Sequence, residues 1–286
     1  MKKFLSAMIF AASLGLVFSS CSSKSSDNSY EKHTVATSQP FTERDVDTAE
    51  GTYIFDKAGI LDAETLKACN DYAGWLYKEM LINVAVITVN DLEGKLPYDF
   101  AAEEFNRLYE GKGSGLIVLI NNDTNYDSIY RSGSCLYNIS DKDEYNAVYW
   151  ETKDIFNGDY RSAIMRLLQL GELCSMHIVD NAQVFDAGQT SKIEKTLASL
   201  KEDVTLIASH NGSDTTNEQI LQQYYDRKYK DKNGIMFMLD TISSKIIVKS
   251  EEKLSSDIEK ALKDANNLSS KGDNYGAVNK ILEALK

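Results

Sequence analysis

The sequence predicts an α/β fold built from two tandem α/β/α sandwich domains, each with a central, mainly parallel sheet flanked by helices. The first observation is a repeat. Ile54–Leu61 reads as an apolar pair, Asp, any residue, Ala, any residue and an apolar pair, and this pattern recurs in Ile178–Phe185. Second, both copies are followed by the same order of helices, strands and turns, which indicates tandem duplication. Third, 286 residues are enough for two ordinary domains.

The hydrophobic pattern predicts the first elements of domain one. Asp62 suits the N-cap of a helix that begins near Ala63. The apolar stripe of this helix consists of Leu66, Cys69, Ala73, Leu76 and Met80. The continuous apolar run Ile82–Val89 is typical of a strand buried on both faces. Pro97 suits the first turn of the next helix, which is expected to end near Tyr109.

Glycines mark the end of that helix and introduce a second apolar strand, Leu116–Ile120. The glycines, at Gly111, Gly113 and Gly115, invite comparison with a phosphate-binding loop. Such a loop lies between a strand and a helix, whereas this one precedes a strand, so a tight turn is the better interpretation. Ser128–Ser132 reads as a third strand. Two helices follow, with apolar stripes at Tyr145, Val148, Tyr149, Thr152 and Ile155, and at Tyr160, Ala163, Ile164, Leu167, Leu168 and Leu170.

The second domain repeats this order in a shorter form. Its strands are predicted at Val204–Ser209, Gly234–Leu239 and Lys245–Lys249, and a Tyr-bearing helix at Asn217–Tyr229. Ser255 or Ser256 suits the cap of the helix that follows, and a terminal helix completes the copy. Because its acidic loop is poorer, we expect a degenerate copy that is kept for packing or for contact with a partner.

The N-terminus predicts export and a lipid anchor. Lys2 and Lys3 precede the apolar run Phe4–Phe18, so residues 1–20 are typical of a secretory signal. The segment resembles a bacterial lipoprotein signal with Cys21 as the acylated first residue; an ordinary signal followed by an incidental cysteine is the alternative. Acyl chains such as palmitate would anchor the protein in a membrane. Residues 21–50 then form a flexible polar tether, residues 51–175 the first domain and residues 176–286 the second.

The expected location is the cell envelope, with the chain facing an extracytoplasmic compartment. Ser22 after the cysteine fits the Gram-negative sorting pattern for the outer membrane. A formal net charge of −12 disfavours nucleic acid partners. The acidity suits cations or a basic protein surface, although it also serves solubility alone. We expect an envelope or membrane protein as the partner.

The cysteines and histidines do not form a recognisable catalytic or zinc pattern. Cys69, Cys135 and Cys174 have no zinc-like spacing, and none has a histidine nearby in the sequence. A Cys/His or Ser/His/Asp site is therefore not expected. Cys69 and Cys174 fall on apolar faces of predicted helices, where cysteine is usually a small core residue. A single disulfide between two of the three remains open.

A run of oxygen-bearing side chains follows the second strand of the first domain. It begins with Asn121, Asn122 and Asp123. Ligands bind at the carboxyl ends of strands in open α/β sheets, and calcium prefers oxygen donors. A polar hairpin turn has the same composition. The candidate metal ligands are Asp56, Asn121, Asn122 and Asp123, with Asp180 and Asp240 as second-copy candidates. Asp56 also suits a turn or cap residue.

Five segments, in order along the first domain, resemble one known family. They read FDKAGIL, VAVITVNDLEG, FNRLY, GSGLIVLI and FNGDYRSAI. Together, from about Ile54 to Leu173, they resemble the TPM domain, which occurs in thylakoid-lumen proteins of photosystem II repair and in bacterial envelope proteins. The resemblance implies a mainly parallel sheet sandwiched by helices. For some members, calcium binding and a weak acid-phosphatase activity have been proposed.

The family's functional residues carry over only in part. Asp56 matches the motif aspartate, but Lys112–Gly115 stands where relatives carry Asp-Asn-Gly. The loop has Asp123 without the adjacent arginine of the family, and Arg131 lies farther on. The preferred hypothesis is therefore a non-enzymatic binding or modulatory module for a membrane complex. The alternative is an acid-phosphatase-like hydrolase that depends on calcium or another divalent cation.

Overall fold

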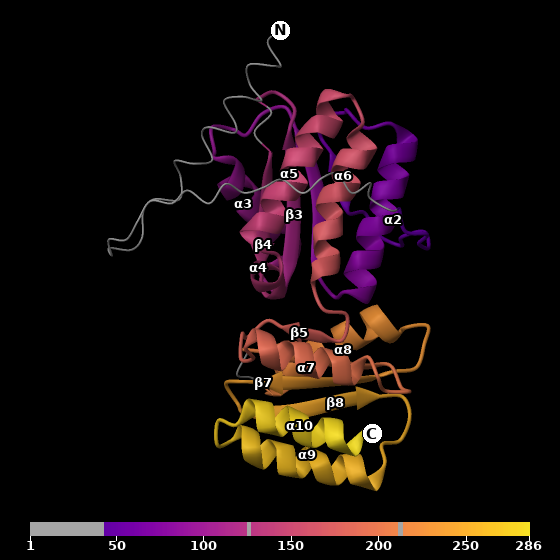
Figure 1. The fold of residues 1–286 in the computed structure, drawn as a ribbon, viewed down its shortest axis with the longest axis vertical. Helices are drawn as coiled ribbons and strands as arrows, with labels where there is room; N and C mark the ends of the chain where they lie inside the picture. The colour runs from indigo at the N-terminus through magenta and orange to yellow at the C-terminus, as the bar shows by residue number, and fades with distance from the viewer. Residues whose placement is uncertain (1–42, 125–126, 211–213) are drawn as a thin grey trace, which may run out of the picture.

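The computed structural model describes residues 43–124, 127–210 and 214–286, which form two α/β halves stacked along the long axis of the molecule (Figure 1). Each half contains one four-stranded, mainly parallel sheet flanked by helices, which confirms the predicted fold class. The signal segment, Cys21 and most of the tether lie outside the described residues. Within the described part of the chain, no helix is long and apolar enough to cross a membrane.

The first half, drawn in indigo to magenta in Figure 1, has the strand order β1-β2-β3-β4. The first three strands are parallel, and β4 is antiparallel to β3. The strands are β1 (Ile54–Asp56), β2 (Asn83–Val89), β3 (Gly115–Asn121) and β4 (Ser128–Ser132). The helices are α2 (Ala63–Glu79), α3 (Pro97–Tyr109), α4 (Ser134–Asn138), α5 (Asp141–Phe156), α6 (Tyr160–Leu168) and the 3-10 helix η1 (Gln169–Leu173).

The second half repeats this topology, with strand order β5-β6-β7-β8 and β8 antiparallel to β7. The strands are β5 (Ile178–Asp180), β6 (Val204–Ser209), β7 (Ile235–Asp240) and β8 (Lys245–Ser250). The helices are α7 (Ala187–Leu197), α8 (Asp214–Tyr229), α9 (Ser256–Ser269) and α10 (Asn274–Ala284). The register agrees as well, because Asp56 pairs with Thr88 and Asp180 pairs with Ala208. The short helix α4 has no counterpart between β8 and α9, a stretch that is described throughout.

Side-chain caps start the helices where the sequence predicts them. Asp62 accepts a hydrogen bond of 2.7 Å from the Thr65 amide at the start of α2, and Ser255 rather than Ser256 caps α9. Asp159 and Asp273, each of which directly follows a glycine, are also caps. Asp159 accepts from the third residue of α6, and Asp273 does the same for α10. The same N-cap arrangement thus starts the last α-helix of each half.

Each sheet is covered on both faces, which explains its continuous apolar strands. In β2, Val84 and Val86 face the cluster that contains α2 and α6, whereas Ala85 and Ile87 face α3. In the second half α7, α9 and α10 cover one face and α8 covers the other. Two residues placed on apolar stripes by sequence, Leu66 and Tyr149, lie exposed instead. The apolar stripes that hydrophobicity predicted for α2 and α5 therefore each include one residue that does not face the core.

The two halves are joined by α8, which lies at their boundary in Figure 1. Arg227 of α8 donates hydrogen bonds to the Ile82 carbonyl at 2.6 Å and to Asn83 Oδ1 at 3.0 Å, and also bonds the Tyr77 carbonyl. Its guanidinium lies 3.3 Å from the centre of the Tyr77 ring. Leu81 of the first half is buried in the α8 cluster of the second. One planar cation thus satisfies several backbone and side-chain acceptors across the boundary.

Candidate functional site

Loops that follow β1, β2 and β3 meet at the carboxyl edge of the first sheet, as a parallel arrangement requires. The Asn122 amide N–H donates to the Val89 carbonyl at 2.8 Å. The Asn122 side chain donates to Asn90 Oδ1 at 2.9 Å, and Asn90 in turn reaches the Ala58 carbonyl at 3.5 Å. The structure therefore brings the predicted residues Asp56, Asn121 and Asn122 to one edge.

Asp56 uses both carboxylate oxygens to hold its own loop. Oδ1 accepts from the Ile60 amide at 3.2 Å and Oδ2 accepts from the Leu61 amide at 3.0 Å. The Thr88 hydroxyl donates to Oδ1 at 2.5 Å. Burial raises the pKa of Asp56, but the hydrogen bonds from Thr88, Leu61 and Ile60 outweigh it and hold the pKa below its usual range. The side chain is thus an ionised carboxylate that shapes the loop after β1.

Asp180 makes the same pair of backbone contacts in the second half. Its oxygens accept from the Val184 amide at 3.2 Å and the Phe185 amide at 3.0 Å. Ala208 occupies the position of Thr88, so there is no hydroxyl donor at this place. Burial raises the pKa of Asp180 above its usual range, because the backbone donors alone do not offset it. The task common to both motif aspartates is therefore to hold the loop.

Asn121 closes the connection between β3 and β4. Its side-chain amide donates to Thr124 Oγ1 at 2.5 Å, and its Oδ1 accepts from the Asp123 amide at 3.3 Å. Its backbone N–H donates to Asp127 Oδ1 at 2.8 Å. Asn121 is buried, whereas Asn122 and Asp123 are exposed. Asp123 therefore presents a carboxylate to solvent at this edge.

A buried pair of carboxyl groups lies behind this edge. Glu151 of α5 is fully buried, and its carboxyl group is in hydrogen-bonding contact with that of Asp127. Burial raises the pKa of Asp127 to about 6. Burial and the neighbouring Asp127 charge raise the pKa of Glu151 well above its usual range. Two adjacent buried carboxyls are most stable when they share one proton.

Sequence reasoning missed this pair. Glu151 lies one helical turn after the buried Ala147, and that spacing is the signal that could have identified it. The apolar stripe chosen for α5 instead included the exposed Tyr149. Among protein atoms of the described chain, Glu151 Oε1 has no hydrogen-bond donor.

The predicted donor set does not fit a tight calcium site as it is arranged. Calcium takes six to eight oxygen ligands. The oxygens of Asp56 and Asn121 already accept from N–H and O–H donors, which leaves Asn122 and Asp123 at the surface. Within residues 43–124, 127–210 and 214–286, no three His, Cys, Asp or Glu side chains gather as a metal-binding group.

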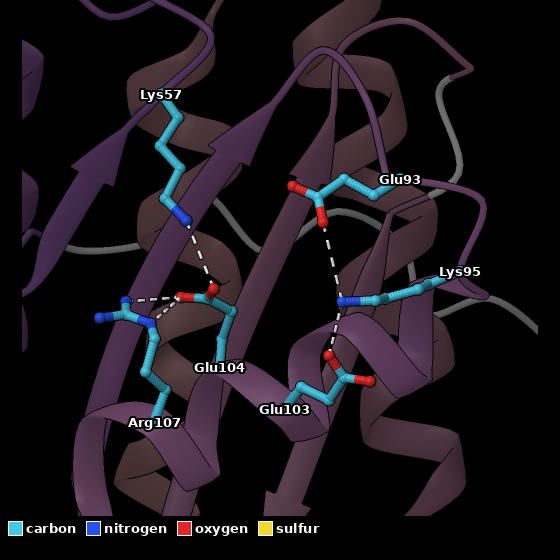
Figure 2. A network of polar contacts seen from close by, with 6 residues as sticks. All are labelled: Lys57, Glu93, Lys95, Glu103, Glu104 and Arg107. Carbon is cyan, nitrogen blue, oxygen red and sulfur yellow. Dashed lines mark hydrogen bonds and ion pairs between the residues drawn. The ribbon is translucent and has the colours of Figure 1, made fainter.

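Charged side chains of α3 and of the loops after β1 and β2 flank the same edge, as Figure 2 shows, and apolar side chains lie beside them. Glu104 pairs with Lys57 at 3.4 Å and with Arg107 at 2.6 Å. A second network joins Lys95 to Glu103 at 2.7 Å and to Glu93 at 3.8 Å. Such exposed pairs contribute little stability. They do neutralise most of the charge on this flank.

Two apolar side chains stand beside these networks. Leu96 is 69% exposed and Tyr98 is 51% exposed. The Tyr98 ring lies 5.4 Å from that of Tyr130 on β4, centre to centre. We call Leu96, Tyr98 and Tyr130 the α3 face. Tyrosine is enriched in protein interfaces, which makes the paired rings of Tyr98 and Tyr130 a candidate contact surface.

Asp240, the second-copy candidate, serves the hairpin between β7 and β8. Its Oδ2 accepts from the Ser243 amide at 3.0 Å and from the Ser243 hydroxyl at 2.5 Å. Asn217 of α8 donates to the same oxygen at 2.9 Å. Asp240 is 2% exposed. It is therefore a buried turn residue in this structure.

Comparison with known proteins identifies one domain. Residues 54–169 match the model of the TPM domain. A solution NMR structure of the N-terminal domain of a protein from P. gingivalis is similar at 15% identity, with a TM-score of 0.39; the match covers 48% of this chain and 92% of that one. No curated protein matches.

Proposed function

From a first half that matches the TPM domain, we propose that this protein is a lipid-anchored envelope component whose two TPM-type halves act as a binding or modulatory module for a membrane protein complex. The second half is taken as a degenerate copy, since it repeats the topology and the aspartate loop of the first. The lipoprotein-like signal that precedes Cys21 supports the anchor.

The observation that carries this proposal is the α3 face beside the carboxyl edge. Leu96 and Tyr98 are the exposed apolar side chains there, and the neighbouring charges are paired with one another. Aromatic side chains with few charged competitors are the usual anchors of protein interfaces. The engaged carboxylate of Asp56 also favours a loop-holding role over a reactive one.

Site-specific crosslinking in the native envelope tests this surface. A photoreactive residue in place of Tyr98 is expected to form a discrete adduct with one membrane protein. Tyr137, on α4, is the matched control because its exposure of 54% is close to the 51% of Tyr98. Equal adducts from both positions, or none from Tyr98, would argue against the α3 face as the binding surface.

The anchor is tested separately. Cys21→Ser is expected to abolish labelling by a fatty acid and to move the protein from the membrane to the soluble fraction. A protein that keeps its membrane association without label would need another means of attachment.

A divalent-metal-dependent, acid-phosphatase-like hydrolase is the second candidate. One observation favours it: the lowered pKa of Asp56 keeps an anionic carboxylate at the edge that also carries Asn122 and Asp123. A divalent ion held there would polarise a phosphoryl oxygen. Turnover of an aryl phosphate that Asp56→Asn abolishes, in a variant that remains folded, would favour this candidate.

A further inference from the structure

Two of the three described cysteines touch each other in the core of the first half. The Sγ atoms of Cys135 and Cys174 lie 3.3 Å apart, and both residues are buried. Cys69 is also buried, but it has no cysteine partner in the described chain. We propose that Cys135 and Cys174 are a redox site that closes into a disulfide when the chain folds in an oxidising compartment.

The geometry requires little movement. The sulfurs of a disulfide are about 2.05 Å apart, so the two Sγ atoms need to approach by roughly 1.2 Å. Both cysteines lie on short, well-anchored segments. Cys135 belongs to α4, whose first residue, Ser134, donates its amide to Ser114 Oγ at 2.8 Å. Cys174 directly follows η1, and its amide donates to the Gly171 carbonyl at 3.1 Å.

The reaction is a thiol–disulfide exchange with a disulfide-bearing oxidant, either glutathione disulfide or an oxidoreductase of the envelope. One cysteine thiolate attacks a sulfur of the oxidant, which forms a mixed disulfide and releases one thiolate. The second cysteine thiolate then attacks the first cysteine's sulfur, and the other half of the oxidant leaves. Two protein thiols lose two protons and two electrons, and the oxidant is reduced to two thiols.

Burial decides when this reaction occurs. The contact with Cys174, together with burial, raises the pKa of the Cys135 thiol well above its usual range, so a thiolate does not form readily in the finished fold. The exchange therefore belongs to folding, while both thiols are accessible. Once closed, the buried bond is protected from reductants.

The disulfide would stabilise the connection between the two halves. Cys174 begins the short connection to β5, and Lys228 of α8 donates to the Met176 carbonyl in that connection at 2.5 Å. A disulfide to α4 fixes the first-half end of the same connection. The relative placement of the two halves would then depend on the redox state in which the chain folds.

Mass-spectrometric mapping of the full chain tests the proposal. The chain is refolded with glutathione disulfide, alkylated in denaturant without reductant and digested. The expected result is a linked peptide pair that contains Cys135 and Cys174, with Cys69 alkylated. Complete alkylation of Cys69, Cys135 and Cys174 after this treatment would overturn the proposal.

Melting temperatures of cysteine variants test the Cys135–Cys174 pairing independently. Folding in the presence of reductant is expected to lower the melting temperature by roughly 5–15 °C in the wild type and in the control variant Cys69→Ala. Cys135→Ala and Cys174→Ala should melt at the same temperature with and without reductant. An equal response to reductant in Cys135→Ala and in the wild type would contradict the assigned pair.

Discussion

The Thr88 hydroxyl lies 2.5 Å from Oδ1 of Asp56, and Ala208 occupies the matching place beside Asp180. The two halves therefore hold the same aspartate loop with and without a hydroxyl donor. Asp180 is also more deeply buried than Asp56, so stronger desolvation and the missing hydroxyl together give the opposite directions of the two pKa shifts, downward for Asp56 and upward for Asp180. Both motif aspartates hold their loops, and the pKa of each is set by the balance between burial and the hydrogen bonds it accepts.

Thr88→Ala is expected to raise the pKa of Asp56 and to lower the free energy of unfolding at pH 7 by about 1–3 kcal/mol, because it removes a hydrogen bond to a charged group. Since the folded pKa of Asp56 is depressed, its stabilising contribution is present at neutral pH and is lost as the pH falls through the folded pKa. Urea unfolding and NMR titration of the carboxyl carbon measure both effects. Thr88→Ser, which keeps a hydroxyl, is the control; a cost equal to that of Ala would contradict this reading.

The Asp127–Glu151 pair predicts the opposite pH dependence. Both folded pKa values are raised, so the native state binds more protons than the unfolded state, and stability should fall as the pH rises from about 4 through about 6. Glu151→Gln is expected to flatten this decline and to raise the free energy of unfolding at pH 8 by about 1–3 kcal/mol. Urea titrations across this pH range provide the measurement.

The control for the pair is Glu103→Gln, which changes an exposed carboxylate in a surface ion pair. It should leave the decline between pH 4 and pH 6 in place. A Glu151→Gln chain that is as pH-sensitive as the wild type would show that the buried pair does not share a proton.

Arg227→Ala is expected to uncouple the halves. The side chain bonds the Tyr77 and Ile82 carbonyls and Asn83 from α8, so its removal leaves several acceptors at the boundary without their donor. Trp75 and Trp150 both lie in the first half, so tryptophan fluorescence reports on that half alone, whereas circular dichroism reports on both. The two urea transitions should coincide in the wild type and separate in the variant.

Lys230→Ala is the matched control for this variant. Lys230 also crosses the boundary, pairing with Glu50 at 3.1 Å, but both side chains are exposed. Its removal should leave the two transitions coincident. Transitions that remain coincident in Arg227→Ala would contradict the role assigned to Arg227.

Much of the fold was predictable because its strands and caps depend on patterns of residues that are close in sequence. The apolar run Ile82–Val89, the cap at Asp62 and the recurrence of the aspartate motif each depend on neighbouring residues only, and the structure confirms the strand, the cap and the paired topology. The short helix α4 was missed because its five residues are fewer than two turns and carry no periodicity.

The site was less predictable, since its properties depend on partners distant in sequence. Glu151 is buried against Asp127, which precedes β4, and the spacing of Glu151 from Ala147 on α5 gives no sign of that partner. Thr88 and Ala208 look like ordinary strand residues until the register places them beside Asp56 and Asp180. The sequence identified Asp56 as a candidate ligand or a turn residue; the structure places it at the carboxyl edge and shows that its oxygens are already engaged.

A calcium titration of the melting temperature of residues 43–286, together with an aryl-phosphate assay of the same protein, decides between a binding module and a metal-dependent hydrolase. Carboxylates that hold loops predict no shift at millimolar calcium and no turnover, since an ion that binds only the folded state must raise the melting temperature. A calcium-dependent rise and a turnover that both disappear in Asp56→Asn would contradict the binding-module account and support the hydrolase.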